Sequence, residues 1–513
     1  MFVATGIRRG AYFDSVTLMK VGRELSGMSG VDDAAVVMGT AENRSILEAS
    51  GLMSGELVHA ADTDLLIAVR ADTEESANAA LATVDGMLES VRGAGAGAGS
   101  YTPRSLGGAL DLVPDANLAL ISVAGRYAGD VAFEALDRGL NVMLFSDNVD
   151  LDTEIALKSR AHERGLLVMG PDCGTAIVNG VPLGFANAVT RGPVGIVAAS
   201  GTGLQEVSSL LSNDGVGISQ ALGTGSRDVT REVGGVTFLD ALRALGDDED
   251  TEVVVLVSKP PDPGVYRAIR EAADGIGKPV VSVFLGMEPA GELDSATLAG
   301  AAARAAAVVR GEAPGPAKGT PDGAGAKIRD LAAGLASAPG AGRKHVRALM
   351  SGGTFASEAV VVFSELGLPD VHANVSSGDA APLDDALRSA GNCVVDMGAD
   401  AFTVGRPHPM IDYSLRRKRL GDESRDPETA VILLDVVLGF GAHPDPASEL
   451  EDAVRDAAQR VAVVCSVTGT ERDPQIRSSV VEALAGAGAT VMPSNESACR
   501  LAGEIVLALL DAR

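Results

Sequence analysis

The sequence predicts an α/β protein of several domains, built mainly on parallel sheets and preceded by a smaller α+β domain. Short apolar runs bounded by turn residues alternate with helical stretches through most of the chain, which is typical of a parallel sheet covered on both faces. A length of 513 residues allows roughly three or four domains of the usual size. Two segments rich in Gly, Ala and Pro, at 92–100 and 311–343, divide the chain into three blocks and are predicted to be linkers.

The first block, residues 1–92, is predicted to be a ferredoxin-like α+β domain. Its apolar runs and helical spacings predict these elements in order: a strand at 1–8, a helix at 14–25, strands at 33–38 and 65–70, and a helix at 74–91. Strands and helices in this order, within a block of this length, suit a sheet with its helices packed on one face.

The middle block is predicted to hold two doubly wound units, a Rossmann-like one at 101–190 and a second at 191–310. The predicted strands are residues 118–123, 141–145, 166–169, 194–198, 253–257 and 279–284. The predicted helices between them are residues 130–138, 153–164 and 204–213. Because the strands are apolar throughout rather than alternating, both faces of each sheet are expected to be buried.

The last block, residues 344–513, repeats this pattern. Its predicted strands are 346–350, 392–397, 430–437 and 462–467, and its predicted helices are 447–458 and 474–485. A short helix near 327–335 is expected within the preceding linker. One motif occurs twice, since the segments starting at Val197 and Leu349 each join a strand to a helix through small residues. Aligned without gaps, the two copies are identical at Gly201 and Gly353, Thr202 and Thr354, and Glu206 and Glu358. This repeat suggests a duplicated fold.

Composition excludes several classes of protein. The net charge of −27 disfavours a nucleic-acid binder, which needs a basic face to displace counterions, and it disfavours docking to anionic lipid. No run reaches the ~20 apolar residues of a spanning helix, and the first residues do not have the pattern of a secretory signal. The four cysteines lie far apart with no C-x-x-C pair, so neither a metal site nor a disulfide framework is predicted. A cytoplasmic protein is expected.

The repeated motif is the first candidate site. A strand that ends in small residues and opens a helix exposes backbone N–H groups at the positive end of the helix dipole, where phosphate or carboxylate binds well. The candidates in the two copies are Ser200, Gly201, Thr202, Gly203, Ser351, Gly352, Gly353 and Thr354. The alternative is an ordinary helix N-cap, at which Ser and Thr are common.

Two histidines are candidates for chemistry. His408 lies between two prolines and close to Arg406, a rigid setting that suits a nucleophile, a general acid or base, or an anion ligand. His443 follows a buried strand and precedes a helix, which is where open α/β sheets bind ligands. For both, a structural histidine is the alternative. Cys173 is a candidate nucleophile at a helix start, although a buried, unreactive cysteine is the commoner case.

Four segments then resemble a known family. Residues 170–174, 195–203 and 223–228 look like the α subunit of succinyl-CoA synthetase, and residues 433–443 look like the glycine turn of its β subunit. Over nearly the whole chain the sequence is similar to the FdrA family of the same superfamily. The motifs that carry this similarity start at Tyr12, Gly405 and Asp435.

The resemblance implies a CoA-binding-like Rossmann domain followed by two flavodoxin-like ligase domains of the succinyl-CoA-synthetase type. It also implies two helix N-termini that face one another. In this sequence the matching residues are Ser200–Gly203 and Gly439–His443. The remaining implied ligands of phosphate or substrate are Gly439, Gly441, Asn187 and Arg227, with Asp228 as a secondary candidate. Members of this family are described as subunits of oxamate carbamoyltransferase or as acyl-CoA synthetases.

The chain also departs from the synthetases. Residues 284–291, where the α subunit carries its phosphohistidine, contain no His, and there is no ATP-grasp domain. His408 or His443 therefore replaces that histidine, or phosphate binds without a covalent step.

Three functions remain open. The preferred one is a carbamoyltransferase subunit, for oxamate plus carbamoyl phosphate, in which His443, His408 and Arg406 act at a phosphate held between two helix ends. The second is an acyl-CoA synthetase subunit of the nucleoside-diphosphate-forming type. It would bind CoA near 123–127 and 146–148 and would rely on a nucleotide-binding partner. The third is a non-catalytic scaffold. Expected partners are an anionic small molecule and other subunits. No cofactor is certain, and CoA and phosphate are the two candidates.

Overall fold

The computed structural model describes residues 2–95, 103, 105–315, 324–336, 342–403 and 407–511, apart from 12, 14, 41, 42, 45, 46 and 49. The chain divides into two compact units, Met1–Ala116 with Asp400–Pro407 and Asn117–Ala399 with His408–Arg513. The predicted α/β fold class, with parallel sheets and a separate N-terminal domain, is confirmed.

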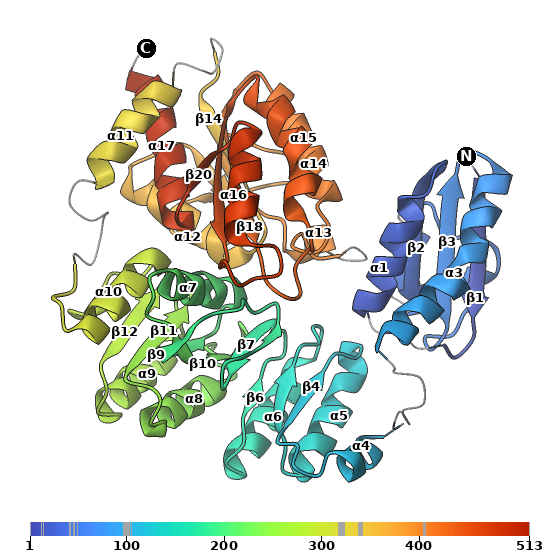
Figure 1. Ribbon diagram of the computed structural model, residues 1–513, viewed down its shortest axis with the longest axis horizontal. Helices are drawn as coiled ribbons and strands as arrows, with labels where there is room; N and C mark the ends of the chain where they lie inside the picture. The colour runs from blue at the N-terminus through green and yellow to red at the C-terminus, as the bar shows by residue number, and fades with distance from the viewer. Residues whose placement is uncertain are drawn as a thin grey trace. The chain divides into compact units, whose positions relative to one another are not determined.

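The first unit contains an antiparallel sheet of order β1-β3-β2 (Figure 1). Its elements are β1 (Phe2–Arg8), α1 (Ser15–Ser26), β2 (Val31–Met38), η1 (Gly55–His59), β3 (Leu65–Ala71), α3 (Glu74–Gly95) and α4 (Leu106–Leu112). Apolar residues of α1 and α3 pack on one face of the sheet, and Leu47, Leu52 and Leu57 pack on the other. Alternating side chains of β3 serve both cores, since Ile67 points to the first and Leu66 to the second. Of the predicted linker at 92–100, residues 93–95 continue α3, and residues 96–100 lie outside the described part.

The second unit begins with a small parallel sheet of order β4-β5-β6. It is built from β4 (Leu118–Ile121), α5 (Gly125–Asp137), β5 (Asn141–Leu144), α6 (Leu151–Glu163) and β6 (Val168–Met169). Each helix connects two neighbouring parallel strands, as in a Rossmann-type unit. A Cβ on Gly125 would lie 2.2 Å from the carbonyl oxygen of Asp147, so the start of α5 packs directly against the loop that follows β5.

The next sheet has the order β13-β12-β11-β9-β10-β7-β8. Its elements are β7 (Thr175–Val178), β8 (Val181–Gly184), β9 (Arg191–Ala198), α7 (Gly201–Asn213), β10 (Ile218–Gly223), α8 (Val236–Asp247), β11 (Val253–Ser258), α9 (Pro263–Gly275), β12 (Val280–Phe284), β13 (Asp294–Ser295) and α10 (Leu298–Arg310). The five strands from β9 to β13 are parallel and have the flavodoxin-like order 2-1-3-4-5. The hairpin β7–β8, which the sequence analysis placed in the preceding unit, pairs antiparallel with β10 and extends this sheet.

The last sheet is entirely parallel, in the order β16-β15-β17-β14-β18-β19-β20. Its elements are β14 (His345–Met350), α12 (Gly353–Glu365), β15 (Val371–Ala373), β16 (Ala381–Pro382), β17 (Asn392–Asp396), α14 (Ser414–Arg425), β18 (Thr429–Val437), α15 (Pro446–Ala458), β19 (Ala462–Thr468), α16 (Arg477–Gly486), β20 (Thr490–Met492) and α17 (Asn495–Asp511). The short helix α13 (Asp400–Thr403), which follows β17 in the chain, belongs to the first unit. Apart from the short β15 and β16, it repeats the flavodoxin-like order. The linker helix expected near 327–335 is α11 (Ala324–Leu335), and its Ile328 and Ala332 are buried in the core.

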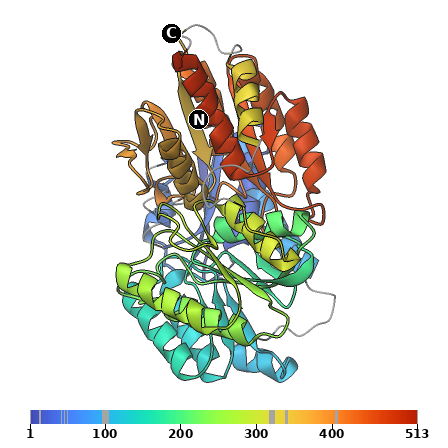
Figure 2. The same cartoon turned by 90° about the vertical axis from the view of Figure 1, so that its left-hand side faces the viewer.

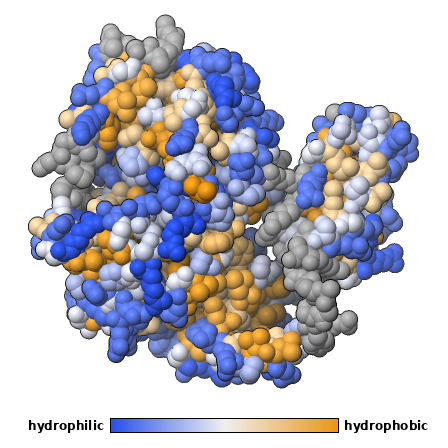
Figure 3. Space-filling view, viewed as in Figure 1, coloured by the Kyte–Doolittle hydropathy of each residue, from blue (hydrophilic) through white to orange (hydrophobic). Residues whose placement is uncertain are grey.

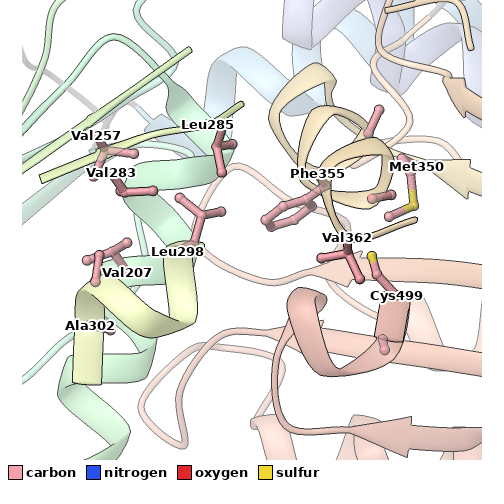
Figure 4. Packing of buried hydrophobic residues seen from close by; sticks show 14 of the residues in the cluster. Val207, Val257, Val283, Leu285, Leu298, Ala302, Met350, Phe355, Val362 and Cys499 are labelled. Carbon is pink, nitrogen blue, oxygen red and sulfur yellow. The ribbon is translucent and has the colours of Figure 1, made fainter. Parts of the chain in front are cut away.

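One apolar core runs through both flavodoxin-like sheets. It includes Val257 and Val283 of the first sheet, Leu298 of α10, and Phe355 and Val362 of α12 (Figure 4). Helices α7 and α12 are in contact, and Figure 2 shows the molecule turned by 90° from the view of Figure 1. The two sheets are therefore held by a shared core, which fixes the geometry of the loops between them.

The viewed face of the molecule carries hydrophilic side chains over most helices, with several separate apolar areas (Figure 3). In the part of the chain that the structure describes, every helix is too short or too polar to cross a lipid bilayer.

Candidate anion site between two helix ends

Two helices start on opposite sides of one cavity. Helix α7 follows β9, and α12 follows β14, and in each sheet that strand is the one at which the strand order reverses. Ser200 is the N-cap of α7, and its side chain accepts a hydrogen bond from the N–H of Gly203. Gly352 is the N-cap of α12 and has no side chain to fill this role. The hydroxyl groups of Ser200 and Thr354 are 2.6 Å apart, so the two helix ends are in direct contact.

Glycine is required by this close approach. A Cβ on Gly352 would lie 2.8 Å from Cγ2 of Thr202, and one on Gly203 would lie 2.8 Å from Cγ1 of Val257. Both distances are shorter than real Cβ contacts. The small residues of the repeated motif therefore let the two helices meet and leave their N-terminal backbone facing the cavity.

The cavity has a volume of about 300 Å³. Its wall combines the two helix ends with side chains from the carboxyl ends of several strands, as expected for open α/β sheets. The larger or chemically active side chains in this wall are Cys173, Phe185, Lys259, Asp396, His408 and Met410.

Lys259 follows directly after β11 and lies beside the start of α12. A Cβ on Gly353, the first residue of α12, would be 3.0 Å from Nζ of Lys259 and 2.8 Å from Oδ2 of Asp396. Asp396 ends β17, and its Oδ1 accepts a hydrogen bond from the N–H of Gly398 at 2.9 Å. Within the described residues, the Lys259 ammonium has no hydrogen-bond or ion-pair partner. A cation without a partner beside two helix N-termini favours an anionic ligand.

His408 also faces this cavity. Its Nδ1 accepts a hydrogen bond from the N–H of Met410 at 3.3 Å, and a Cβ on Gly398 would be 3.0 Å from its Nε2. Burial, together with the charge of Arg416, lowers the pKa of His408 to about 4. The imidazole is therefore neutral at pH 7, and because Nδ1 is an acceptor, its proton is on Nε2.

The other candidate histidine, His443, is placed elsewhere. Its side chain is buried. The backbone N–H of His443 donates to the carbonyl oxygen of Met410 at 2.8 Å, and the ring Nδ1 accepts from the backbone N–H of Asp445 at 3.0 Å. Its ring meets the Tyr413 ring edge-on, with centroids 5.9 Å apart. The described part of the cavity wall does not include His443, which instead holds the backbone of Met410.

The glycine turn after β18 does not supply the second helix end that the resemblance implied. A Cβ on Gly439 would lie 2.6 Å from the carbonyl oxygen of Phe185, and one on Gly441 would lie 2.7 Å from the Phe185 ring. Asn187 donates from Nδ2 to the carbonyl oxygen of Leu438 at 2.9 Å. The glycine turn therefore packs against Phe185, and the side chain of Asn187 is hydrogen-bonded to its backbone. The helix end that faces Ser200–Gly203 belongs to α12, the other copy of the repeated motif.

Three further candidates have structural partners outside the cavity. Ser351 donates both its N–H and its hydroxyl to the buried carboxylate of Asp435. The guanidinium of Arg227 pairs with Glu154 at 2.8 Å. Asp228 is fully buried and binds Lys158 at 2.7 Å and the N–H of Phe238 at the start of α8. Arg406 lies outside the described residues.

Cys173 lies in the cavity wall but is not an activated nucleophile. Burial raises the pKa of its thiol to about 12, and the thiol donates to the carbonyl oxygen of Gly223. Sequence reasoning missed Lys259, Asp396 and Phe185 as site residues. Lys259 and Asp396 had a usable signal, because each stands at the carboxyl end of a predicted strand.

Comparisons with known proteins agree with this architecture. Residues 191–312 match the family described as succinyl-CoA ligase like flavodoxin domain, and residues 349–505 match the CoA-ligase family. Residues 1–103 match the family described as AllF, heavy metal-associated domain. The protein YahF of Escherichia coli K12 is 38% identical over 517 residues, which cover 99% of each chain. This chain belongs to the FdrA-like family that includes YahF.

Another relative matches only part of the chain. The α subunit 1 of an ADP-forming succinate–CoA ligase from Archaeoglobus fulgidus is 31% identical over 176 residues, which are 34% of this chain and 59% of that protein. The solved structure of a dinucleotide forming acetyl-coenzyme A synthetase from Ca. Korarchaeum cryptofilum, in complex with phosphate and ADP, matches 81% of this chain and 87% of that chain. The identity there is 16% and the TM-score 0.32. The YahF-family chain thus combines a flavodoxin domain of the succinyl-CoA-ligase type with a CoA-ligase domain. The expected carbamoyltransferase activity finds no support among these matches.

The N-terminal domain does not fit a soft metal ion, although its family is named for heavy metals. Residues 1–103 contain no cysteine and a single histidine, His59. The described residues include no group of three or more His, Cys, Asp or Glu side chains arranged to hold a metal. Thiolate or clustered imidazole ligands, which soft metals prefer, are missing from this domain's sequence.

Proposed function

We propose that this chain is a subunit of an acyl-CoA synthetase of the nucleoside-diphosphate-forming type, and that the cavity between α7 and α12 binds the phosphoryl group of its phosphate or acyl phosphate ligand. The observation that carries this proposal is the meeting of two helix N-termini and the Lys259 ammonium at one cavity.

The charges of this site suit a phosphoryl group. Each helix N-terminus has the effect of roughly +0.5 charge, and the positive Lys259 side chain lies beside one of them. The Asp396 carboxylate, which lies near Lys259 at the start of α12, offsets part of this positive charge, and a phosphoryl group with several acceptor oxygens pairs with the rest. Apart from the N–H of Gly203, which donates to Ser200, the first N–H groups of α7 and α12 and the hydroxyl of Thr202 are the proposed donors.

His408 completes the donor set in this proposal. Its tautomer places the proton on Nε2, so the neutral ring donates a hydrogen bond to a phosphoryl oxygen and needs no proton transfer. This role differs from that of a phosphohistidine, in which an unprotonated ring nitrogen attacks phosphorus, because the unprotonated nitrogen here, Nδ1, already accepts a hydrogen bond from the N–H of Met410. The proposed reaction therefore uses phosphate held without a covalent bond to the protein.

The proposed CoA site adjoins this cavity. The carboxyl ends of β4 and β5, which the sequence analysis selected at 123–127 and 146–148, lie in the same unit as the cavity. Phe145 directly follows β5, and its ring stacks on Phe185 with centroids 5.7 Å apart. A thiol bound at that sheet edge has a short path to the phosphoryl site along these two rings. Nucleotide chemistry is assigned to a partner subunit.

Calorimetric titration of the full chain with phosphate, CoA and carbamoyl phosphate tests the proposal. We expect phosphate and CoA to bind. Lys259→Met should weaken phosphate about 10- to 100-fold, since a charged hydrogen bond contributes roughly 1.5–3 kcal/mol. Lys344→Met is the matched control, because Lys344 pairs with Glu428 on the surface. Tight binding of carbamoyl phosphate without any binding of CoA would overturn the proposal.

A further inference from the structure

The cavity has room for more than a phosphoryl group. Its volume of about 300 Å³ matches the lower end of small-molecule sites, which run from ~300 to ~1,000 Å³. A phosphate ion with its five heavy atoms fills only part of this space. The rest of the cavity must therefore accommodate the group that the phosphoryl is attached to.

An apolar wall formed by Phe185 and Met410 bounds this remaining space. Phe185 is held firmly, since its carbonyl oxygen accepts a hydrogen bond from Gln205 at 2.7 Å. Its ring lies between two glycines: a Cβ on Gly174 would be 3.3 Å from one edge and a Cβ on Gly441 would be 2.7 Å from the other. Larger residues at these two positions would displace the ring. The chain thus fixes a half-buried phenyl ring in the wall of a polar site.

The apolar wall stands next to the proposed phosphoryl donor. The centroids of the Phe185 and His408 rings are 6.0 Å apart. If His408 binds a phosphoryl oxygen, the acyl chain of an acyl phosphate begins only a few bonds away. An apolar chain or ring at that position packs on Phe185 and leaves water, which favours its binding.

The charges in the described wall disfavour a second carboxylate on the substrate. Lys259 is the one cationic side chain of that wall, while Asp172 and Asp396 are acidic. With Lys259 bound to the phosphoryl group, the distal carboxylate of a dicarboxylic acid finds no cation in this part of the wall. It would meet like charge instead.

We infer that the acid activated at this site is a monocarboxylic acid with an apolar chain or ring, and that Phe185 determines this preference. The inference rests on the proposed function, because it takes the anion site to hold a phosphoryl group. It adds the substrate class and the residue that selects it.

Phosphonates, which join a stable anionic head to different tails, test the inference by titration of the full chain. The probes are phosphate, methylphosphonate, benzylphosphonate and 3-phosphonopropionate. Benzylphosphonate should bind at least 10-fold more tightly than methylphosphonate, and 3-phosphonopropionate should bind no more tightly than methylphosphonate. Phe185→Ala should abolish the benzyl advantage and leave phosphate affinity within about 2-fold.

Two further variants keep this test decisive. Phe185→Leu retains an apolar side chain and should keep most of the benzyl advantage even if the alanine variant fails to fold. Phe440→Ala removes an exposed phenyl ring from the glycine turn that packs behind Phe185, and it should leave all four affinities unchanged. If phosphate binds but the benzyl tail adds nothing, or the carboxylate tail binds best, the substrate class is wrong and the proposed function stands. If neither phosphate nor any phosphonate binds, both proposals fail together.

Discussion

Glu206 of α7 and Glu358 of α12 each bind the N-terminal backbone of a helix that belongs to the other flavodoxin-like sheet. Oε1 of Glu206 accepts from the N–H of Asn495 at the start of α17, at 2.9 Å. Oε1 of Glu358 accepts from the N–H of Leu298 at the start of α10, at 2.7 Å. The two glutamates occupy equivalent positions of the repeated motif, so the duplicated sequence makes a reciprocal pair of interdomain contacts. Both side chains are buried, and they hold α7 and α12 in the register that places their N-termini at one cavity.

The buried glutamates predict that stability falls as the pH rises. Burial raises the pKa of Glu358 to about 8, and burial also raises the pKa of Glu206 and of Glu496. The folded state therefore keeps protons that the unfolded chain releases near pH 4.5, and it loses stability as the pH rises from about 4.5 to 8. Between pH 6.5 and 8.5, thermal unfolding of the full chain should show a midpoint that decreases. Below pH 6.5, the lowered pKa values of His345 and His408 add a slope of the opposite sign.

Glu358→Gln checks the origin of that slope. The amide keeps the bond from the N–H of Leu298, and the Asn495 side chain can turn its buried Oδ1, which lacks a partner among the described residues, toward the new NH₂ group. The variant should have a shallower dependence on pH, with the remainder contributed by Glu206 and Glu496. A slope equal to that of the wild type would show that Glu358 is ionised in the folded protein.

Gly352→Ala should weaken phosphate binding through crowding of the two helix ends. The added Cβ would lie 2.8 Å from Cγ2 of Thr202, so α7 and α12 must separate by a few tenths of an ångström or more. We expect a loss of about 10-fold in phosphate affinity, and Thr202→Ser in the same chain should restore part of it because the serine lacks that methyl group. No recovery in the double variant would mean that the loss comes from the N-cap itself.

His408 and His443 should respond differently to alanine. His408→Ala removes a donor from the cavity wall and should lower phosphate affinity about 10-fold. His443→Ala should lower the unfolding temperature, because the side chain is buried, while phosphate affinity stays within about 2-fold. Titration and thermal unfolding of both variants check this. A larger affinity loss for His443→Ala would place that residue in the site.

Lys158→Met should destabilise the chain by about 3–5 kcal/mol, the usual result of leaving buried charges without their partner. Lys158 is fully buried and binds both Glu154 and Asp228, and it joins α6 to the loop before α8. Denaturant unfolding measures the loss. Arg243→Met is the control, because Arg243 makes an exposed pair with Asp240 and its removal should change the free energy of unfolding by less than about 1 kcal/mol.

Much of the fold was readable from the sequence. The apolar runs 253–257 and 430–437 form β11 and β18. A strand that is apolar on both sides is stable only where both faces of its sheet are covered, so these runs predict central strands of a parallel sheet. Sequence reasoning missed β10 and the hairpin β7–β8. The hairpin is stabilised by pairing with β10, which lies about 40 residues later in the chain. A strand that depends on such a distant partner has no recognisable pattern in its own local sequence.

The candidate site was readable only in part. The small residues of the two motifs, from Ser200 and from Gly352, mark helix starts by local rules that need no tertiary information. Arg227, and Asp228 as a secondary candidate, were also expected at the site, yet both are used in interdomain ion pairs. Whether a charged side chain faces a ligand or a neighbouring domain depends on what packs against it, and sequence spacing does not contain that information.

By itself, then, the sequence determined the alternation of strands and helices, the duplication of the flavodoxin-like unit and the two helix starts with their Gly-Thr pairs. These follow from hydrophobic periodicity and local backbone preferences. Only the tertiary structure decided that the two copies meet face to face, that α12 rather than the turn at Gly439 stands opposite α7, and that Lys259, Asp396, His408 and Phe185 share one cavity. Those residues are far apart in the chain. They come together because the two sheets bury a common apolar core, and the hydrophobic effect favours that burial.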